Sequence, residues 1–353
     1  MPAINCSILP PKKHPKEATA AGGGGGLPAP RSGNIASSPP SSFSFQELSN
    51  ATDNFSSQCL LRREESGSVY KGTLRGGELV AIKKLDGNVR QSNMRLLVEV
   101  LILNCLTHPN IVKMIGYCSD SDRRLLVYEY LPAGLLPDRL HDPSPGQNLL
   151  DWAARMKIAA GAAKALEYLH NKAKPQVIFR DFKTSSVLLD NGDWPKLYNF
   201  GLSKICSIKN EPHRVVGTQG YCAPEQAEPG QLSIKSDLYS FGVVLLELIT
   251  GRKAIDTSKP EGEQKLVQWA RKYLDDGKNL EQIADPRMEG KFPRRGLYQA
   301  LMVASLCIRD DPNGRPLISN VATALSYLVT QSNFPDDDGG GGDKNVESSL
   351  NVG

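Results

Sequence analysis

The feature that most constrains the fold is a change in the periodicity of apolar residues at Pro132. Before it, between residues 68 and 130, short runs rich in β-branched and aromatic residues predominate, with one stretch of helical periodicity between them. After it, apolar residues recur at the spacing of long amphipathic helices. We therefore predict an α+β fold with two lobes, in which a small β-rich lobe with one helix precedes a larger helical lobe.

Two helices of the second lobe can be delimited from local signals. Asp151 suits the N-cap of a helix whose apolar face runs from Trp152 to Leu166. A second helix is predicted from Asp237 to near Gly251, because glycine commonly follows the last turn of a helix. Both helices are expected to lie in the core of the larger lobe.

The two ends of the chain differ in composition from its middle. Residues 1–42 are rich in Gly, Pro, Ser and Ala, and they hold too few large apolar groups to offset the entropy of ordering them. Residues 330–353 are acidic and glycine-rich. We expect both segments to be disordered and the folded domain to span residues 43–329, with lobes at about 43–130 and 131–329.

Composition and charge exclude several classes of protein. No run approaches the roughly 20 apolar residues of a transmembrane helix, and the N-terminal residues do not resemble a secretory signal. A net charge of +4 without a basic stripe argues against a nucleic-acid partner. The seven cysteines lack the spacing of a zinc site or a redox pair, so reduced thiols are expected.

These exclusions indicate a cytoplasmic protein. Peripheral association with the plasma membrane would need a lipid anchor, and Pro2 excludes N-myristoylation. Palmitoylation of Cys6 is the remaining route, and the alternative is that Cys6 is an ordinary exposed thiol.

Residues 79–84 alternate so that Ala81 and Lys83 share one face of a predicted strand. A small residue beside a lysine suits adenine and phosphate, although an ordinary edge strand can also carry lysines. The context favours a nucleotide, because Gly67 and Val69 precede this strand and Glu99 follows on the predicted helix. We predict that Glu99 forms an ion pair with Lys83 and aims the lysine at phosphate.

Three short motifs follow in a fixed order in the second half of the chain. They are Arg180-Asp181, Asn199-Phe200-Gly201 and Ala223-Pro224-Glu225. Their order and spacing resemble the H-R-D, D-F-G and A-P-E motifs of eukaryotic protein kinases, although each motif alone is weak. The wider sequence resembles the plant receptor-like cytoplasmic kinases over about residues 43–329, above all in segments 43–55, 126–130, 235–242 and 314–316.

The resemblance implies a role for each matching residue. Asp181 would accept the proton of a substrate hydroxyl, and Lys183 would steady the charge of the transferring phosphoryl group. Glu129 to Leu131 would form the hinge that meets adenine, and Tyr128 would be the gatekeeper. The implied nucleotide-binding set is Gly67, Val69, Ala81, Lys83, Glu99, Glu129 and Leu131.

Other matching residues are expected to stabilise the domain. Glu225 is predicted to pair with Arg315, and Asp237 is predicted to hold the backbone of the catalytic loop. Phe179 replaces the histidine of H-R-D, and we expect it to pack in a hydrophobic spine beside Phe200.

The sequence departs from the kinase pattern where nucleotide and metal would bind. The first two glycines of the phosphate loop are replaced by Arg62 and Glu64, which leaves Gly67 alone. Glu64 and Glu65 add negative charge that repels phosphate, and Arg62 and Arg63 compensate for it in part. The two metal positions carry Asn199 and Ser186, a neutral amide and a short hydroxyl, whereas hard divalent cations prefer anionic oxygen. We therefore expect weak binding of ATP and a poor site for Mg²⁺.

The activation segment, residues 199–225, also departs from the family. The phosphorylated Ser-Thr pair of the family would fall on Pro212 and His213, which cannot carry that phosphate. Thr218 resembles the threonine of the substrate platform. We hypothesise that Glu211 takes the place of the missing phosphate and pairs with Arg180.

Two functions compete on these observations. The first is a kinase-shaped scaffold, decoy or regulator in receptor signalling, whose partners are receptor kinases or other signalling proteins. The second is a weak Ser/Thr kinase that transfers the γ-phosphate of ATP to protein hydroxyls, because Lys83, Glu99, Asp181 and Lys183 all remain. Phosphate incorporation by the purified chain discriminates between them.

Overall fold

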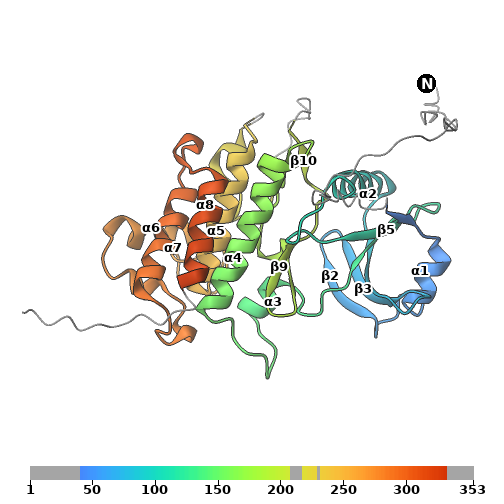
Figure 1. Cartoon of the computed structure of the whole chain (residues 1–353), viewed down its shortest axis with the longest axis horizontal. Coiled ribbons are helices and arrows are strands. Elements are labelled where there is room, and N and C mark those ends of the chain that lie inside the picture. The colour runs from blue at the N-terminus through green and yellow to red at the C-terminus, as the bar shows by residue number, and fades with distance from the viewer. Residues whose placement is uncertain (1–39, 207–216, 229–230, 332–353) are drawn as a thin grey trace, which may run out of the picture. The chain divides into compact units, whose positions relative to one another are not determined.

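The structure, a computed structural model, describes residues 40–206, 217–228 and 231–331. Strands gather in the first part of the chain and helices in the second, as Figure 1 shows, which confirms the predicted α+β fold with a β-rich and a helical lobe. The strands are β1 (Ser41–Ser42), β2 (Leu60–Glu64), β3 (Gly67–Thr73), β4 (Leu79–Leu85), β5 (Met114–Cys118), β6 (Leu125–Glu129), β7 (Val177–Ile178), β8 (Val187–Asp190), β9 (Trp194–Leu197) and β10 (Lys204–Ile205). The α-helices are α1 (Phe45–Ala51), α2 (Val89–Leu103), α3 (Leu136–Leu140), α4 (Trp152–Glu167), α5 (Ile234–Thr250), α6 (Leu266–Asp276), α7 (Arg294–Cys307) and α8 (Ile318–Gln331).

The first lobe is built on a six-stranded sheet with the order β1-β5-β6-β4-β3-β2. Strand β4 alternates as predicted, because Ala81 belongs to the main hydrophobic core while Val80 and Ile82 face a smaller core that also contains Leu48 of α1. The two faces of β4 are therefore buried against different parts of the lobe.

The hairpin of β2 and β3 brings Glu64 opposite Gly67 in register. Gly67 has a φ of +149°, and a Cβ built on it would lie 2.1 Å from the carbonyl oxygen of Lys84 on β4. Glycine is required at this position by the close approach of two strands, whatever the neighbouring loop binds.

The larger lobe contains the two helices that the sequence delimited. Asp151 caps α4 as predicted, and its carboxylate accepts a hydrogen bond of 2.8 Å from the backbone N–H of Ala154. Helix α5 begins earlier than predicted, at Ile234, because Ser233 is its N-cap and Asp237 lies within its first turn. It ends as expected before Gly251, which has a φ of +66°.

The folded part extends slightly beyond the boundaries that composition suggested. Ser41 and Ser42 form β1, which pairs in parallel with β5, and α8 continues to Gln331. Composition gives no sign of β1, because its two serines contribute backbone hydrogen bonds rather than apolar surface. Across residues 40–206, 217–228 and 231–331, no helix combines the length and the apolar character needed to cross a membrane.

Candidate active site

A cavity of about 250 Å³ lies between the sheet of the first lobe and the loops of the second. Its lining brings together five of the predicted site residues, namely Lys83, Glu99, Asp181, Lys183 and Asn199. Both of the lobes contribute to it. The other predicted site residues, Gly67, Val69, Ala81, Glu129, Leu131 and Ser186, are not part of this lining.

The catalytic loop holds Asp181 and Lys183 in a compact network with Thr218. Lys183 Nζ lies 3.1 Å from Asp181 Oδ2 and 2.6 Å from Thr218 Oγ1. The hydroxyl of Thr218 donates a hydrogen bond of 2.7 Å to Asp181 Oδ1. This arrangement fixes the orientation of the Asp181 carboxylate, the group that would give general-base assistance to a hydroxyl.

The backbone of this loop is held from below by the buried side chain of Asp237. Its carboxylate accepts hydrogen bonds of 2.7 Å from the backbone N–H groups of Phe179 and Arg180, and it lies 2.8 Å from His170 Nε2. The predicted structural role of Asp237 is confirmed. Its position inside the first turn of α5 explains why the helix needs Ser233 as its cap.

Phe179 packs as the sequence predicted. Its ring lies 4.9 Å from the ring of Phe200 and 5.8 Å from the ring of Phe182, both in edge-to-face geometry. All three side chains are buried. An apolar residue in place of histidine therefore preserves the packing under the catalytic loop.

Lys83 is fully buried, and its partner differs from the predicted one. Its Nζ lies 2.9 Å from Glu64 Oε2 and donates a hydrogen bond of 3.0 Å to Asn199 Oδ1. Within the described part of the chain, Glu64 rather than Glu99 is the carboxylate at ion-pair distance from Lys83. The prediction of a Lys83–Glu99 ion pair is wrong for this conformation, because the β2–β3 hairpin delivers a nearer carboxylate.

Glu99 is also buried, but its carboxylate accepts a hydrogen bond of 3.1 Å from the backbone N–H of Phe200. Burial raises the pKa of Glu99, and attraction to Lys83 only partly offsets this effect. Glu99 thus connects α2 to the Asn199-Phe200-Gly201 segment instead of clamping the lysine.

Glu64 is the centre of a polar cluster that the sequence analysis did not anticipate. Besides Lys83, its carboxylate lies 2.6 Å from Arg62 Nε and accepts hydrogen bonds of 3.1 and 3.2 Å from the hydroxyl of Tyr198. The ring of Tyr198 also has the cations of Arg62 and Lys83 at 5.2 and 5.1 Å from its centroid. It meets the ring of Tyr128, the predicted gatekeeper, at 5.4 Å.

The opposite charges of this cluster stabilise the ionised forms of Glu64 and Lys83. Burial alone raises the pKa of Glu64, but Lys83 and Arg62 outweigh burial and lower the pKa below its ordinary value. Burial alone lowers the pKa of Lys83, but Tyr198, Glu64 and Glu99 outweigh burial and raise it. The cluster therefore contains an ionised carboxylate bound to an ionised lysine.

The two metal positions are both engaged with protein groups. Asn199 Oδ1 accepts the hydrogen bond from Lys83, and Ser186 Oγ donates a hydrogen bond of 3.0 Å to the backbone carbonyl of Asp181. Ser186 is fully buried. With Glu64 at the lysine and neutral oxygens at both metal positions, these side chains do not fit a triphosphate with its magnesium ions in this conformation.

The predicted adenine-contacting residues have ordinary structural surroundings. Val69, Ala81 and Leu131 are buried in the main core. Glu129 is the last residue of β6, and its carboxylate lies 2.8 Å from Lys196 Nζ. These positions agree with a hinge between the lobes, and the role in nucleotide binding stays a prediction.

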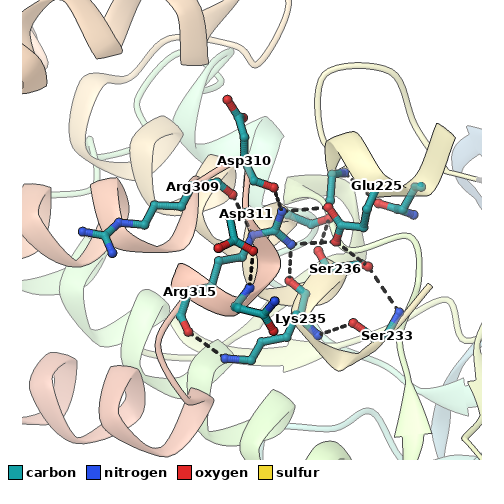
Figure 2. Close-up of polar contacts among 12 residues, drawn as sticks. Glu225, Ser233, Lys235, Ser236, Arg309, Asp310, Asp311 and Arg315 are labelled. Atoms are coloured by element: carbon teal, nitrogen blue, oxygen red, sulfur yellow. Dashed lines mark hydrogen bonds and ion pairs between the residues drawn. The ribbon is translucent and has the colours of Figure 1, made fainter. Parts of the chain in front are cut away.

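The end of the activation segment is fixed to the helical lobe by a buried ion pair, as predicted. Figure 2 shows the guanidinium of Arg315 facing Glu225, with two contacts of 2.7 Å between them. Ser236 donates a further hydrogen bond of 2.8 Å to Glu225. Glu211, Pro212 and His213 lie outside the described residues, so the hypothesis of a phosphate substitute at Glu211 stays a prediction.

The chain is similar in sequence to a known family of proteins. A model of the protein kinase domain matches residues 63–325 of the chain. The probable serine/threonine-protein kinase PBL7 of Arabidopsis thaliana is 57% identical over 297 residues, which are 83% of this chain and 79% of the relative. The serine/threonine-protein kinase PBS1 of Arabidopsis thaliana is 55% identical over 316 residues, 88% of this chain and 69% of the relative. The chain therefore belongs to the protein kinase family, and within it to the plant receptor-like cytoplasmic kinases.

Proposed function

We propose that this kinase of receptor-like cytoplasmic type is impaired in magnesium-dependent phosphotransfer and acts as a scaffold, decoy or regulator in receptor signalling. The observation that supports this most strongly is the pair of neutral side chains, Asn199 and Ser186, at the two metal positions. Both already have hydrogen-bond partners within the domain. The rest of the kinase fold is preserved around them, as a protein that presents surfaces to partners requires.

The size of the expected defect follows from the role of the metal. Metal ions contribute several kcal/mol of charge stabilisation in phosphoryl transfer. A loss of about 4 kcal/mol slows the reaction roughly a thousandfold, because each 1.4 kcal/mol is about a factor of ten. Kinases typically turn over about 1–100 times per second, so the expected residual rate is on the order of 0.001–0.1 per second.

A weak Ser/Thr kinase is the second candidate. The observation that favours it is the network of Asp181, Lys183 and Thr218, whose short contacts match the proton-accepting half of the reaction. The relatives named above are serine/threonine-protein kinases by name. On this alternative the phosphate would pass from ATP to a protein hydroxyl.

Phosphate incorporation separates the two candidates. The full chain, Asp181→Asn, and the double variant Asn199→Asp with Ser186→Asn are incubated with labelled ATP, Mg²⁺ and a generic protein substrate. We expect the unmodified chain to incorporate no more phosphate than Asp181→Asn, and the double variant to gain incorporation. Robust magnesium-dependent incorporation by the unmodified chain, abolished by Asp181→Asn, overturns the proposal in favour of the weak kinase.

We propose that the folded domain works in the cytoplasm with receptor kinases or other signalling proteins as partners. Palmitoylation of Cys6, which lies outside the described residues, would add peripheral attachment to the plasma membrane. Metabolic labelling of the chain with a palmitate analogue, with Cys6→Ser as the control, tests the attachment directly.

A further inference from the structure

We propose that Glu64 acts as an internal substitute for a nucleotide phosphate, and that its carboxylate keeps nucleotides away from Lys83. The inference deepens the proposed function, because it adds a second barrier that does not depend on the metal positions. Glu64 lowers the affinity of this cleft for a nucleoside triphosphate, whereas Asn199 and Ser186 limit the binding of metal.

The position of Glu64 in the hairpin is the first support. It is the last residue of β2, and in the kinase pattern its place belongs to a glycine of the phosphate loop. A glycine there leaves room above the lysine, whereas Glu64 extends a carboxylate to 2.9 Å from Lys83 Nζ. The anion that this lysine holds is therefore supplied by the chain itself.

The burial and partners of Glu64 are the second support. Its side chain is 15% exposed, that of Lys83 is 0% exposed, and a buried ion pair of this kind resists separation. Arg62 approaches from the same strand at 2.6 Å, and the hydroxyl of Tyr198, which directly follows β9, donates a hydrogen bond to the same carboxylate. Glu64 thus has two cations and a hydroxyl around it, which are the donors that a phosphate group would seek.

Tyr198 connects the β2–β3 hairpin to the segment that contains Asn199. Tyr198 is 1% exposed, and the cations of Arg62 and Lys83 lie 5.2 and 5.1 Å from the centroid of its ring. The hairpin is therefore attached to the residue that immediately precedes Asn199. A triphosphate that entered would have to displace the Glu64 carboxylate from Lys83 and would also be repelled by it. The apparent affinity for nucleotide is therefore the intrinsic affinity multiplied by the fraction of molecules in which this contact is open.

The chain offers a matched control for the charge. Glu65 is the next residue, carries the same charge and also lines the cavity, but its side chain is exposed, and no ion pair or hydrogen bond of Glu65 occurs among the described residues. Glu64→Gly and Glu65→Gly remove one negative charge and add one glycine at adjacent positions. A difference in ATP affinity between the two variants therefore reports the contact with Lys83, because the loss of charge and the added flexibility of the loop are the same in both.

The test measures binding of ATP to the full chain without magnesium, by calorimetry or with a fluorescent ATP analogue. We expect Glu64→Gly to bind at least about tenfold more tightly than the unmodified chain, and Glu65→Gly to change affinity by less than about threefold. Glu64→Gln, which keeps the shape and removes the charge, should also gain affinity, and it serves if the glycine variant does not fold. Equal affinity of the unmodified chain and the Glu64 variants, or an equal gain in Glu65→Gly, overturns the inference.

This readout is independent of the proposed function. If the unmodified chain transfers phosphate in the assay above, the impairment is refuted, while the affinity difference still decides the role of Glu64. If the chain transfers none and the Glu64 variants gain no affinity, the impairment stands without this barrier.

Discussion

The buried pair of Glu225 and Arg315 allows a quantitative prediction for Glu225→Gln. The side chain of Arg315 is 0% exposed and that of Glu225 is 10% exposed, so the pair is almost fully withdrawn from water. After the substitution the guanidinium keeps its backbone partners, the carbonyl groups of Arg309 and Lys235 at 2.8 Å and of Asp310 at 3.2 Å, but no anion. Removing one partner of a buried pair costs about 3–5 kcal/mol.

We expect Glu225→Gln to lower the free energy of unfolding by about 3 kcal/mol, near the lower end of this range, because glutamine retains one acceptor for Arg315. At roughly 2–4 °C per kcal/mol for a domain of this size class, the melting temperature should fall by about 6–12 °C. The assay is thermal denaturation of the full chain, with Glu228→Gln as the control, because Glu228 is exposed and only three residues away. Glu228→Gln, as a surface substitution, should change the free energy of unfolding by less than about 0.5 kcal/mol.

The difference in stability between the unmodified chain and Glu225→Gln should decrease as the pH falls. Burial acts to raise the pKa of Glu225, but hydrogen bonds from Arg315 and Ser236 outweigh burial and lower it below the ordinary value of 4.5. The stability that the carboxylate contributes is therefore complete above pH 4.5 and is lost as the pH falls through the lowered value. The gap in melting temperature between the unmodified chain and Glu225→Gln should narrow in acid. A melting temperature of Glu225→Gln within 2 °C of Glu228→Gln at neutral pH would refute the reasoning.

Three further substitutions test other parts of the structure. Asp237→Asn should destabilise the domain by about 2 kcal/mol, because the catalytic-loop N–H groups lose a charged acceptor. Hydrogen exchange of these amides should become faster, and unchanged exchange would contradict this prediction. Gly67→Ala should cost at least about 2 kcal/mol in urea denaturation, because its Cβ meets the carbonyl of Lys84 and its φ is positive; a neutral effect would show that the strands separate easily. Asp285→Ala should cost about 3–5 kcal/mol in the same assay, since it leaves the buried guanidinium of Arg155 without its anion; a loss under 1 kcal/mol would mean that the pair contributes little.

Features that depend on local periodicity were predictable from the sequence. The alternation of β4, the cap at Asp151 and the stop at Gly251 each follow from a few neighbouring residues. Asp237 illustrates where local reasoning ends. Its side chain resembles a helix cap, but tertiary hydrogen bonds to the catalytic loop occupy its carboxylate, and the helix begins three residues earlier.

The partner of Lys83 could not be found in the same way. From the sequence, Glu64 is a charge that repels a bound phosphate. That interpretation considers only the state in which the ligand is present. Without ligand, the lysine attracts the nearest carboxylate that the hairpin can deliver, and only the three-dimensional register shows that this carboxylate is Glu64. The one available signal was the replacement of a phosphate-loop glycine by a residue of opposite charge to Lys83. Tyr198 carried no signal, because its partners Glu64 and Tyr128 are far from it in the sequence.

Asn199 holds one backbone conformation with consequences for how this protein can evolve. Its φ is +70°, a left-handed geometry that most residues with a side chain avoid but that asparagine and aspartate both tolerate. Exchanging one for the other alters the charge of the cleft and leaves the chain path undisturbed. Because the codons of asparagine and aspartate differ by a single base, one mutational event is enough to place an acid at position 199. The backbone conformation at this position therefore does not oppose such an exchange.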